Sequence, residues 1–290
     1  FEVQNNAFWF DPENPLSRSA DANTSTAILA SSFVVAEKEG NVLIEIDNVF
    51  LSEALHQISR GFVPGSPNKN PFKMGKLAKD RTKYAAIKNY PENTDLAVQY
   101  VYTNPLPTNR GSDRGLTDPR SVNVTIQHSF IQMPENNYTP RFEDVRVGYF
   151  STQITNMTIP DDVTPYRDLI HRWHLEKKDP QQERSEPVEP IVWWIENTTP
   201  HEFRDAIKEG VLAWNKAFEE AGFRNTVQVK IQPDDAAWDA GDIRYNVLRW
   251  TSSPNPPFGG YGPSFVNPRT GQILGADIML EYVYFTNRVK

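Results

Sequence analysis

A continuous apolar run at residues 191–195 constrains the fold more than any other feature of this 290-residue chain. The run, I-V-W-W-I, has the length of a strand and shows no alternation of polar and apolar residues. Such a strand is typical of sheets that are covered on both faces. The run therefore predicts an interior strand, and a crossover helix is expected to follow it.

The residues after this strand carry the signals of one long helix, from residue 200 to residue 222. Thr199 can cap the first turn, Pro200 suits the first helical position, and Glu202 completes a capping box. Apolar residues then recur at spacings of three and four, which predicts one stripe on the helix. The stripe consists of Phe203, Ile207, Val211, Trp214 and Phe218.

The same helix is expected to end in a Schellman motif, with Gly222 in the left-handed conformation and Phe223 against Phe218. Four strands are expected after it, the last two antiparallel across the turn 267–271. They span residues 227–231, 243–250, 261–266 and 272–280. A strand–helix–strand start followed by a hairpin predicts a mixed sheet.

The first half of the chain has the patterns of a β-rich region. Strands are expected at 27–37, 42–46, 95–102 and 121–131, the first two forming a hairpin around residues 39–41. A short helix is expected at 50–59, and long loops at 61–83 and 105–120, which are rich in Pro, Gly, Asn and charge. These patterns predict a separate β-rich domain.

A nearly wholly polar segment at 175–190 is the best candidate for a domain boundary, because little in it can bury a face. The expected organisation is a β-rich accessory domain at 1–165, a connecting strand and polar linker at 166–190, and a mixed sheet with one long helix at 191–290. The fold class is therefore expected to be α+β.

Composition excludes several classes of function. Without cysteine the chain has no disulfide, no thiolate nucleophile and no Cys-type zinc site. Its 30 basic and 37 acidic residues give a net charge of −7, which argues against a nucleic-acid partner. The most apolar stretch, 26–36, is broken by Ser31 and Ser32 and is too short for a membrane span of about 20 residues. The chain opens on Phe1 without a signal-peptide pattern, as expected of a processed product.

Two histidine patterns have part of the spacing that metal binding needs. His171 and His174 have a spacing that could place two ligands on one helical face, but the surrounding residues favour a strand with the rings on opposite sides. The segment from His201 to Asp205 has the start of an H-E-x-x-H zinc motif, yet its fifth residue is Asp. Both patterns favour structural or surface roles.

Two further segments have the composition, but not the spacing or context, of ligand sites. An acidic loop contains Asp234, Asp235, Asp239 and Asp242 but lacks the spacing of a calcium loop, which favours a solvated turn. The glycines at 259, 260 and 262 lack the strand-to-helix context of a phosphate-binding loop. From local chemistry alone, the chain has no recognisable active site.

Four ordered motifs in the second half give a specific resemblance. They are E-P-I-V-W-W-I-E-N-T-T-P, I-K-E-G-V-L-A-W-N-K-A-F-E-E-A-G-F, D-I-R-Y-N-V-L-R-W and G-P-S-F-V-N-P-R-T-G-Q-I-L-G-A-D-I. Residues 189–280 resemble the front half of the catalytic domain of large bacterial zinc-dependent metalloproteases related to metzincins. Upstream, E-G-N-V-L-I-E-I and R-V-G-Y-F resemble the β-rich domain that accompanies it. In that group the turn usually carries Asp and Glu where this chain has Asn267 and Gln272.

The resemblance implies a zinc endopeptidase in which a helix with H-E-x-x-H binds the metal and activates water. This chain ends at Lys290 before any such motif, so the zinc ligands are expected beyond Lys290 in the parent protein, and the chain alone is expected to be inactive. No catalytic residue and no metal ligand is assigned here. The resemblance also implies a secreted, periplasmic or cell-surface location, a peptide or protein substrate, and contact with the remainder of the catalytic domain.

The part of the site that the resemblance does place in this chain is the edge strand of the sheet, to which an extended substrate adds as another strand. Its expected substrate-binding residues are Tyr261, Gly262, Pro263, Ser264, Phe265 and Val266. The alternative is a non-catalytic secreted module that binds a carbohydrate or a surface protein, motivated by the 12% aromatic content.

Overall fold

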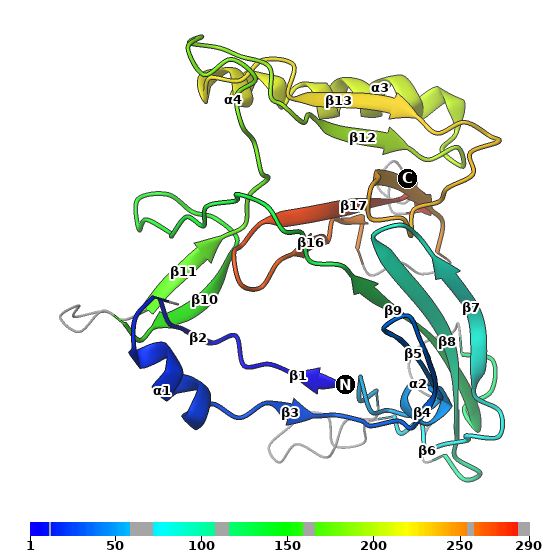
Figure 1. Cartoon of the computed structure of the whole chain (residues 1–290). Coiled ribbons are helices and arrows are strands. Elements are labelled where there is room, and N and C mark those ends of the chain that lie inside the picture. Colours follow the sequence, from blue (N-terminus) through cyan, green and yellow to red (C-terminus); the bar gives the residue numbers. More distant parts are fainter. Residues whose placement is uncertain (12, 59–71, 108–115, 159–165, 254–257, 284–290) are drawn as a thin grey trace. The chain divides into compact units, whose positions relative to one another are not determined.

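The computed structural model describes residues 1–11, 13–58, 72–107, 116–158, 166–253 and 258–283. Strands predominate over helices, so the chain has a β-rich α+β fold (Figure 1). It divides into two compact units. Unit 1 comprises residues 1–5 and 18–130, and unit 2 comprises residues 6–17 and 131–290. Helix α1 (Leu16–Asn23) begins in unit 2 and continues into unit 1.

Unit 1 is built from short antiparallel pairs and one larger sheet, in which the long strand β8 pairs with β6, β7 and β9. Its elements are β1 (Glu2–Val3), β3 (Ala27–Ile28), β4 (Val34–Lys38), β5 (Asn41–Ile44), α2 (Asp47–Phe50), β6 (Lys76–Leu77), β7 (Lys83–Asn89), β8 (Asn93–Thr103) and β9 (Ser121–Ile131).

The core of unit 1 lies between α2 and β8. It contains Val49, Phe50, Leu96, Val98, Tyr100 and Tyr102. The Tyr100 hydroxyl donates to the Phe50 carbonyl at 2.8 Å. The Tyr102 hydroxyl donates to the Glu53 carboxylate at 2.7 Å. The two phenols therefore lie inside the core with their polar ends paired, and burial raises the pKa of both.

Several expectations for unit 1 are confirmed. Strand β9 has the predicted bounds, and its exposed Asn123, Thr125 and Gln127 alternate with half-buried or buried neighbours. The hairpin of β4 and β5 is also present. Its turn places Glu39 and Gly40 at φ of +52° and +79°, the conformation that tight hairpin turns require. The strand expected at 27–37 is divided into β3 and β4.

The helix expected at 50–59 is wrong. Helix α2 ends at Phe50 and is followed by turns. The Ser52 hydroxyl donates to the carbonyls of Asn48 and Val49. The Glu53 carboxylate accepts hydrogen bonds from the Ile58 N–H and the Tyr102 hydroxyl. Side-chain bonds to the backbone thus compete with helix propagation.

The segment 61–83, which was expected to be a loop because of its polar composition, contains β6 and the start of β7. Parts of these predictions lie outside the described residues. They are residue 59 of the expected helix, residues 61–71 of the first expected loop and residues 108–115 of the second.

Unit 2 contains a three-stranded sheet in the order β11–β10–β2 and a six-stranded mixed sheet. Its elements are β2 (Phe8–Trp9), β10 (Ser151–Asn156), β11 (Tyr166–Ile170), β12 (Ile191–Ile195), α3 (His201–Leu212), α4 (Asn215–Glu220), β13 (Val227–Ile231), β14 (Asn246–Thr251), β15 (Gly260–Tyr261), β16 (Ser264–Val266) and β17 (Ile273–Glu281).

The mixed sheet has the order β13–β12–β14–β17–β15, and β16 pairs with β17 beside β15. Strand β12 is parallel to β13 and β14, and β14 is parallel to β17. Strands β15 and β16 run antiparallel to β17. The predicted mixed sheet, its interior strand at 191–195 and its terminal hairpin are therefore present, with the strand expected at 261–266 interrupted at Gly262 and Pro263.

The long helix differs from its prediction at its start and in its middle. Pro200 occupies the N-cap without a side-chain cap bond, and Thr199 is buried with its carbonyl accepting Arg204 Nε. The prediction of a capping box at Thr199 and Glu202 is therefore wrong.

The helix divides into α3 and α4 at Trp214. The side-chain amide of the next residue, Asn215, bonds the backbone N–H and C=O of Val227. Its Schellman end is confirmed by the Phe223 N–H to Phe218 carbonyl bond at 2.9 Å and by Gly222 at φ +86°. The stripe is incompletely covered, since Trp214 is 66% exposed.

The polar segment 175–190 is held within unit 2, and the boundary between the compact units falls at 130–131 instead of 165–166. Lys177 Nζ donates to the carbonyls of Gln182 and Glu183, and Ser185 is buried beside Gly222. Backbone and lysine hydrogen bonds thus order a segment that has few apolar groups to bury. Residues 159–165, next to the predicted boundary, lie outside the described residues.

Candidate functional site: an open sheet edge

The strands β15 and β16 form one edge of the mixed sheet in unit 2. Tyr261 is opposite Met279, and Ser264 is opposite Ala276. Within the ranges that the structure describes, no strand pairs with the other side of β15 and β16. All six predicted substrate-binding residues, 261–266, therefore lie on or between the strands of this edge.

The hydrogen bonds to β17 decide which backbone groups of the edge remain free. The N–H of Glu281 donates to the Gly259 carbonyl and that of Asp277 donates to the Pro263 carbonyl. Gly259 and Pro263 therefore direct their backbone groups toward β17. Neighbouring residues of an antiparallel strand direct their backbone groups to opposite sides, so every second residue from Gly260 onward directs its N–H and C=O away from β17. The outward residues are Gly260, Gly262, Ser264 and Val266.

Proline occupies a suitable place in this edge. Pro263 is an inward residue, so its missing N–H removes no donor from the outward side. The four outward residues all keep an N–H and a C=O. Among the residues that the structure describes, no strand pairs with these groups, so the edge offers the ladder of backbone donors and acceptors that adding another strand requires.

The turn 267–271 holds the end of this edge in place. The Asn267 N–H bonds the Gln272 carbonyl at 2.9 Å, and Asn136 Nδ2 bonds the Gln272 side-chain oxygen at 3.1 Å. Gly271 has φ +78°, and its carbonyl accepts the Arg172 N–H. Asn267 and Gln272 are both buried, and the Asn267 side-chain oxygen accepts the Arg269 N–H within the turn, while Gln272 joins the turn to Asn136.

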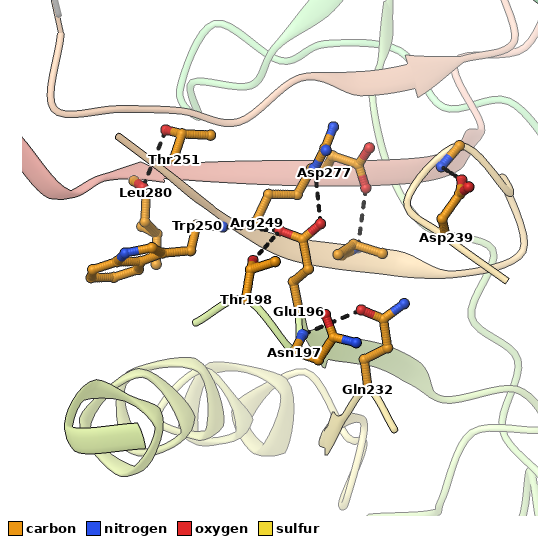
Figure 2. Close-up of polar contacts among 12 residues, drawn as sticks. Glu196, Asn197, Thr198, Gln232, Asp239, Arg249, Trp250, Thr251, Asp277 and Leu280 are labelled. Carbon is orange, nitrogen blue, oxygen red and sulfur yellow. Dashed lines mark hydrogen bonds and ion pairs between the residues drawn. The ribbon is translucent and has the colours of Figure 1, made fainter. Parts of the chain in front are cut away.

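A network of polar side chains lies at the ends of β12, β13 and β14 (Figure 2). The Glu196 carboxylate accepts the Thr198 hydroxyl at 2.9 Å and the Trp250 N–H at 3.2 Å, and it lies 3.6 Å from Arg249 Nε. The Asn197 N–H donates to the Gln232 side chain at 3.3 Å. The side chains of Glu196 and Gln232 thus join the end of β12 to β14 and to the residue that follows β13.

Glu281 has the same fastening role at the end of β17. Its carboxylate accepts the N–H groups of Ser253 and Val283 and the hydroxyl of Thr251. Burial alone would raise the pKa of this carboxyl, but these hydrogen bonds together lower it below its ordinary value of 4.5. The carboxylate form is therefore the one that the fold stabilises.

Replacing Glu281 by Gln is expected to lower the melting temperature at pH 7 by about 3–8 °C, because the hydrogen bonds lose a charged acceptor. Since the folded pKa is lowered, the stability contributed by Glu281 is complete above its unfolded pKa and is lost as the pH falls through the folded value. Thermal melts between pH 7 and pH 3 should fall less steeply for the variant. Parallel curves would contradict this role.

The predicted histidine and aspartate candidates are not brought together. His171 Nε2 lies 2.8 Å from the Thr152 hydroxyl, and His174 Nε2 lies 3.7 Å from the Glu176 carboxylate. The first residue of the partial zinc motif, His201, is exposed at the start of α3. In the acidic loop, the buried Asp242 is paired with Arg244 at 2.7 Å.

The described residues contain no group of three or more His, Cys, Asp or Glu side chains placed to hold a metal ion. The zinc that the resemblance implies therefore has no fitting site among them. No helix in the described ranges combines the length and apolar character that a membrane crossing needs.

One feature of the edge was missed by sequence reasoning. Phe258 lies just before the predicted residues, and its ring centroid is 6.1 Å from that of Tyr261. The two side chains are 46% and 55% exposed. The signal that could have found Phe258 is the uncharged run F-G-G-Y-G-P-S-F-V at 258–266, which begins with it.

The fold and this edge define a β-rich α+β protein with an open mixed sheet. Residues 2–178 match the family model described as "Domain of unknown function (DUF5117)", and the chain belongs to this family. No curated protein and no solved structure matches the chain.

Proposed function

We propose that this chain supplies the substrate-binding edge and the accessory region of a zinc-dependent endopeptidase of the metzincin type. The observation that carries the proposal is the run of outward backbone groups at 260, 262, 264 and 266 on an antiparallel edge strand. The mixed sheet with its helical crossover supports the resemblance drawn from the four sequence motifs.

On this proposal an extended peptide or protein segment pairs with β15 and β16. Its backbone donors and acceptors meet those of the outward residues, each bond contributing about 0.5–1.5 kcal/mol. Such pairing binds the main chain of many sequences and orients a scissile bond along the edge. The role proposed for these residues is to bind and position the substrate.

The metal chemistry is assigned to the parent protein, with zinc ligands and the rest of the catalytic domain outside this chain. When bound, zinc would supply the activated water that attacks the peptide carbonyl. We expect no peptide hydrolysis from residues 1–290 alone, because H-E-x-x-H does not occur in their sequence. A periplasmic, secreted or cell-surface location belongs to the same proposal and depends on the same resemblance.

The alternative of a carbohydrate-binding module has less support. A sugar platform needs exposed aromatic faces, yet six of the seven tryptophans are half-buried and Trp214 is the exposed one. Trp194, Trp238 and Tyr245 contact one another, with a centroid distance of 3.8 Å between Trp238 and Tyr245. These three aromatic side chains are therefore used in packing.

Replacing Ser264 by Pro tests the proposed pairing. The change removes one outward N–H while Pro263 and Phe265, whose backbone groups face β17, are untouched. We expect binding of a blocked hexapeptide with Phe among Ala and Thr residues to weaken about tenfold or more in isothermal titration calorimetry.

The matched control is Ser264→Ala, which removes the hydroxyl and keeps the N–H, and which should bind like the unmodified chain. Thermal melts of both variants check that the sheet is intact. Equal affinity of Ser264→Pro and Ser264→Ala, with both folded, would exclude main-chain pairing at this edge.

A further inference from the structure

The exposed aromatic pair of Phe258 and Tyr261 stands at the beginning of the open edge. The two rings contact each other at a tilt of 46°. Each also leaves roughly half of its surface in solvent. Tyrosine is enriched among the residues that contribute most to binding once a partner buries them. The pair is therefore accessible to a peptide bound at the edge.

The alternation of the edge places Tyr261 on a defined face, and the ring of Phe258, which precedes the strand, contacts that of Tyr261. Tyr261, Pro263 and Phe265 share one face of the strand, and Gly260, Gly262 and Ser264 share the other. One face is thus lined by rings and the other by small side chains. A peptide paired with the edge would direct alternate side chains to each face.

Charge is absent from this segment, since residues 258–266 contain no Asp, Glu, Lys or Arg. Charged residues make up 23% of the whole chain, so the contrast is local. A charged substrate side chain placed against the aromatic pair would lose hydration without gaining an ionic partner from this segment. An aromatic or large aliphatic side chain would instead bury apolar surface on both partners.

We propose that Phe258 and Tyr261 form a specificity subsite that selects an aromatic or large aliphatic side chain of the extended peptide. The inference rests on the proposed function, because it needs a peptide paired with β15 and β16. The backbone ladder would then provide affinity that is independent of sequence. The aromatic pair provides the preference among sequences.

The test uses four blocked hexapeptides that differ at one central residue, Phe, Ala, Arg or Glu, with Ala and Thr at the other positions. Their affinities for residues 1–290 are measured by titration calorimetry. We expect the Phe peptide to bind about tenfold tighter than the Ala and Glu peptides. Tyr261→Ala should reduce this ratio below about twofold, and Tyr261→Phe should preserve it, since the ring remains.

Ser264→Pro separates this inference from the proposed function. It should weaken all four peptides by a similar factor and leave their ranking unchanged. Equal binding of the Phe and Ala peptides, with the Ser264→Pro effect intact, would overturn the subsite and keep the pairing. Preference for Arg would overturn it in favour of a cation–π subsite. Failure of the unmodified chain to bind any of the four would overturn the proposed function itself.

Discussion

Replacing Tyr102 by Ala is expected to lower the free energy of unfolding of unit 1 by about 3–5 kcal/mol, as large aromatic deletions in protein cores do. Tyr102 is 0% exposed and packs in the cluster formed by α2 and β8. The deletion leaves a cavity and also removes one of the hydrogen-bond donors to the Glu53 carboxylate. Urea unfolding followed by tyrosine-sensitive circular dichroism measures the loss.

Tyr102→Phe is the matched control. It keeps the ring and removes the hydroxyl that donates to Glu53 at 2.7 Å. The expected loss is about 1.5–3 kcal/mol, because the bond involves a charged acceptor. Equal losses in the two variants would mean that the ring contributes nothing to packing, against the buried position of Tyr102.

Replacing Gly271 by Ala is expected to destabilise unit 2 by about 2–4 kcal/mol. The residue has φ +78°, which side chains of L-residues rarely adopt. An added Cβ would also collide with the Ile170 carbonyl and lie 3.4 Å from the Leu169 Cβ. The turn between β16 and β17 would have to move away from the end of β11, and thermal or urea melts would detect the change.

Gly210→Ala is the control of opposite sign. Gly210 lies inside α3, and nothing stands within 4 Å of the position of an added Cβ. Alanine should therefore stabilise the helix by about 0.5–1 kcal/mol. If Gly271→Ala were as well tolerated as Gly210→Ala, the close approach of the turn to Ile170 would be excluded.

Sequence periodicity predicted the elements whose signal is local and strong. Strand β9 has its predicted bounds, because its polar and apolar residues alternate with period two. The end of α4 follows from Gly222, whose left-handed conformation satisfies the last carbonyls of the helix. The edge residues 261–266 came from the metalloprotease resemblance, and the proteolytic role remains a prediction.

The errors arose where a distant partner outweighed local preference. The expected helix at 50–59 is displaced by bonds from Glu53 to Ile58 and to Tyr102, the second of which is distant in sequence. The long helix is interrupted because Asn215 bonds the backbone of Val227. The polar segment 175–190 was expected to be a linker, but the backbone of Ser185 bonds that of Gly222 and Arg224 after α4.

By itself, the sequence determined where the strongest strands and helix turns begin and end, and that the segment 258–266 carries no charge. These properties depend on neighbouring residues along the chain, so periodicity and composition suffice to find them. The tertiary structure alone decided the order and register of the strands at this edge, which of its backbone groups face outward, and that Phe258 meets Tyr261. Strand order and register depend on the sum of many contacts between distant residues, and no local pattern contains that sum.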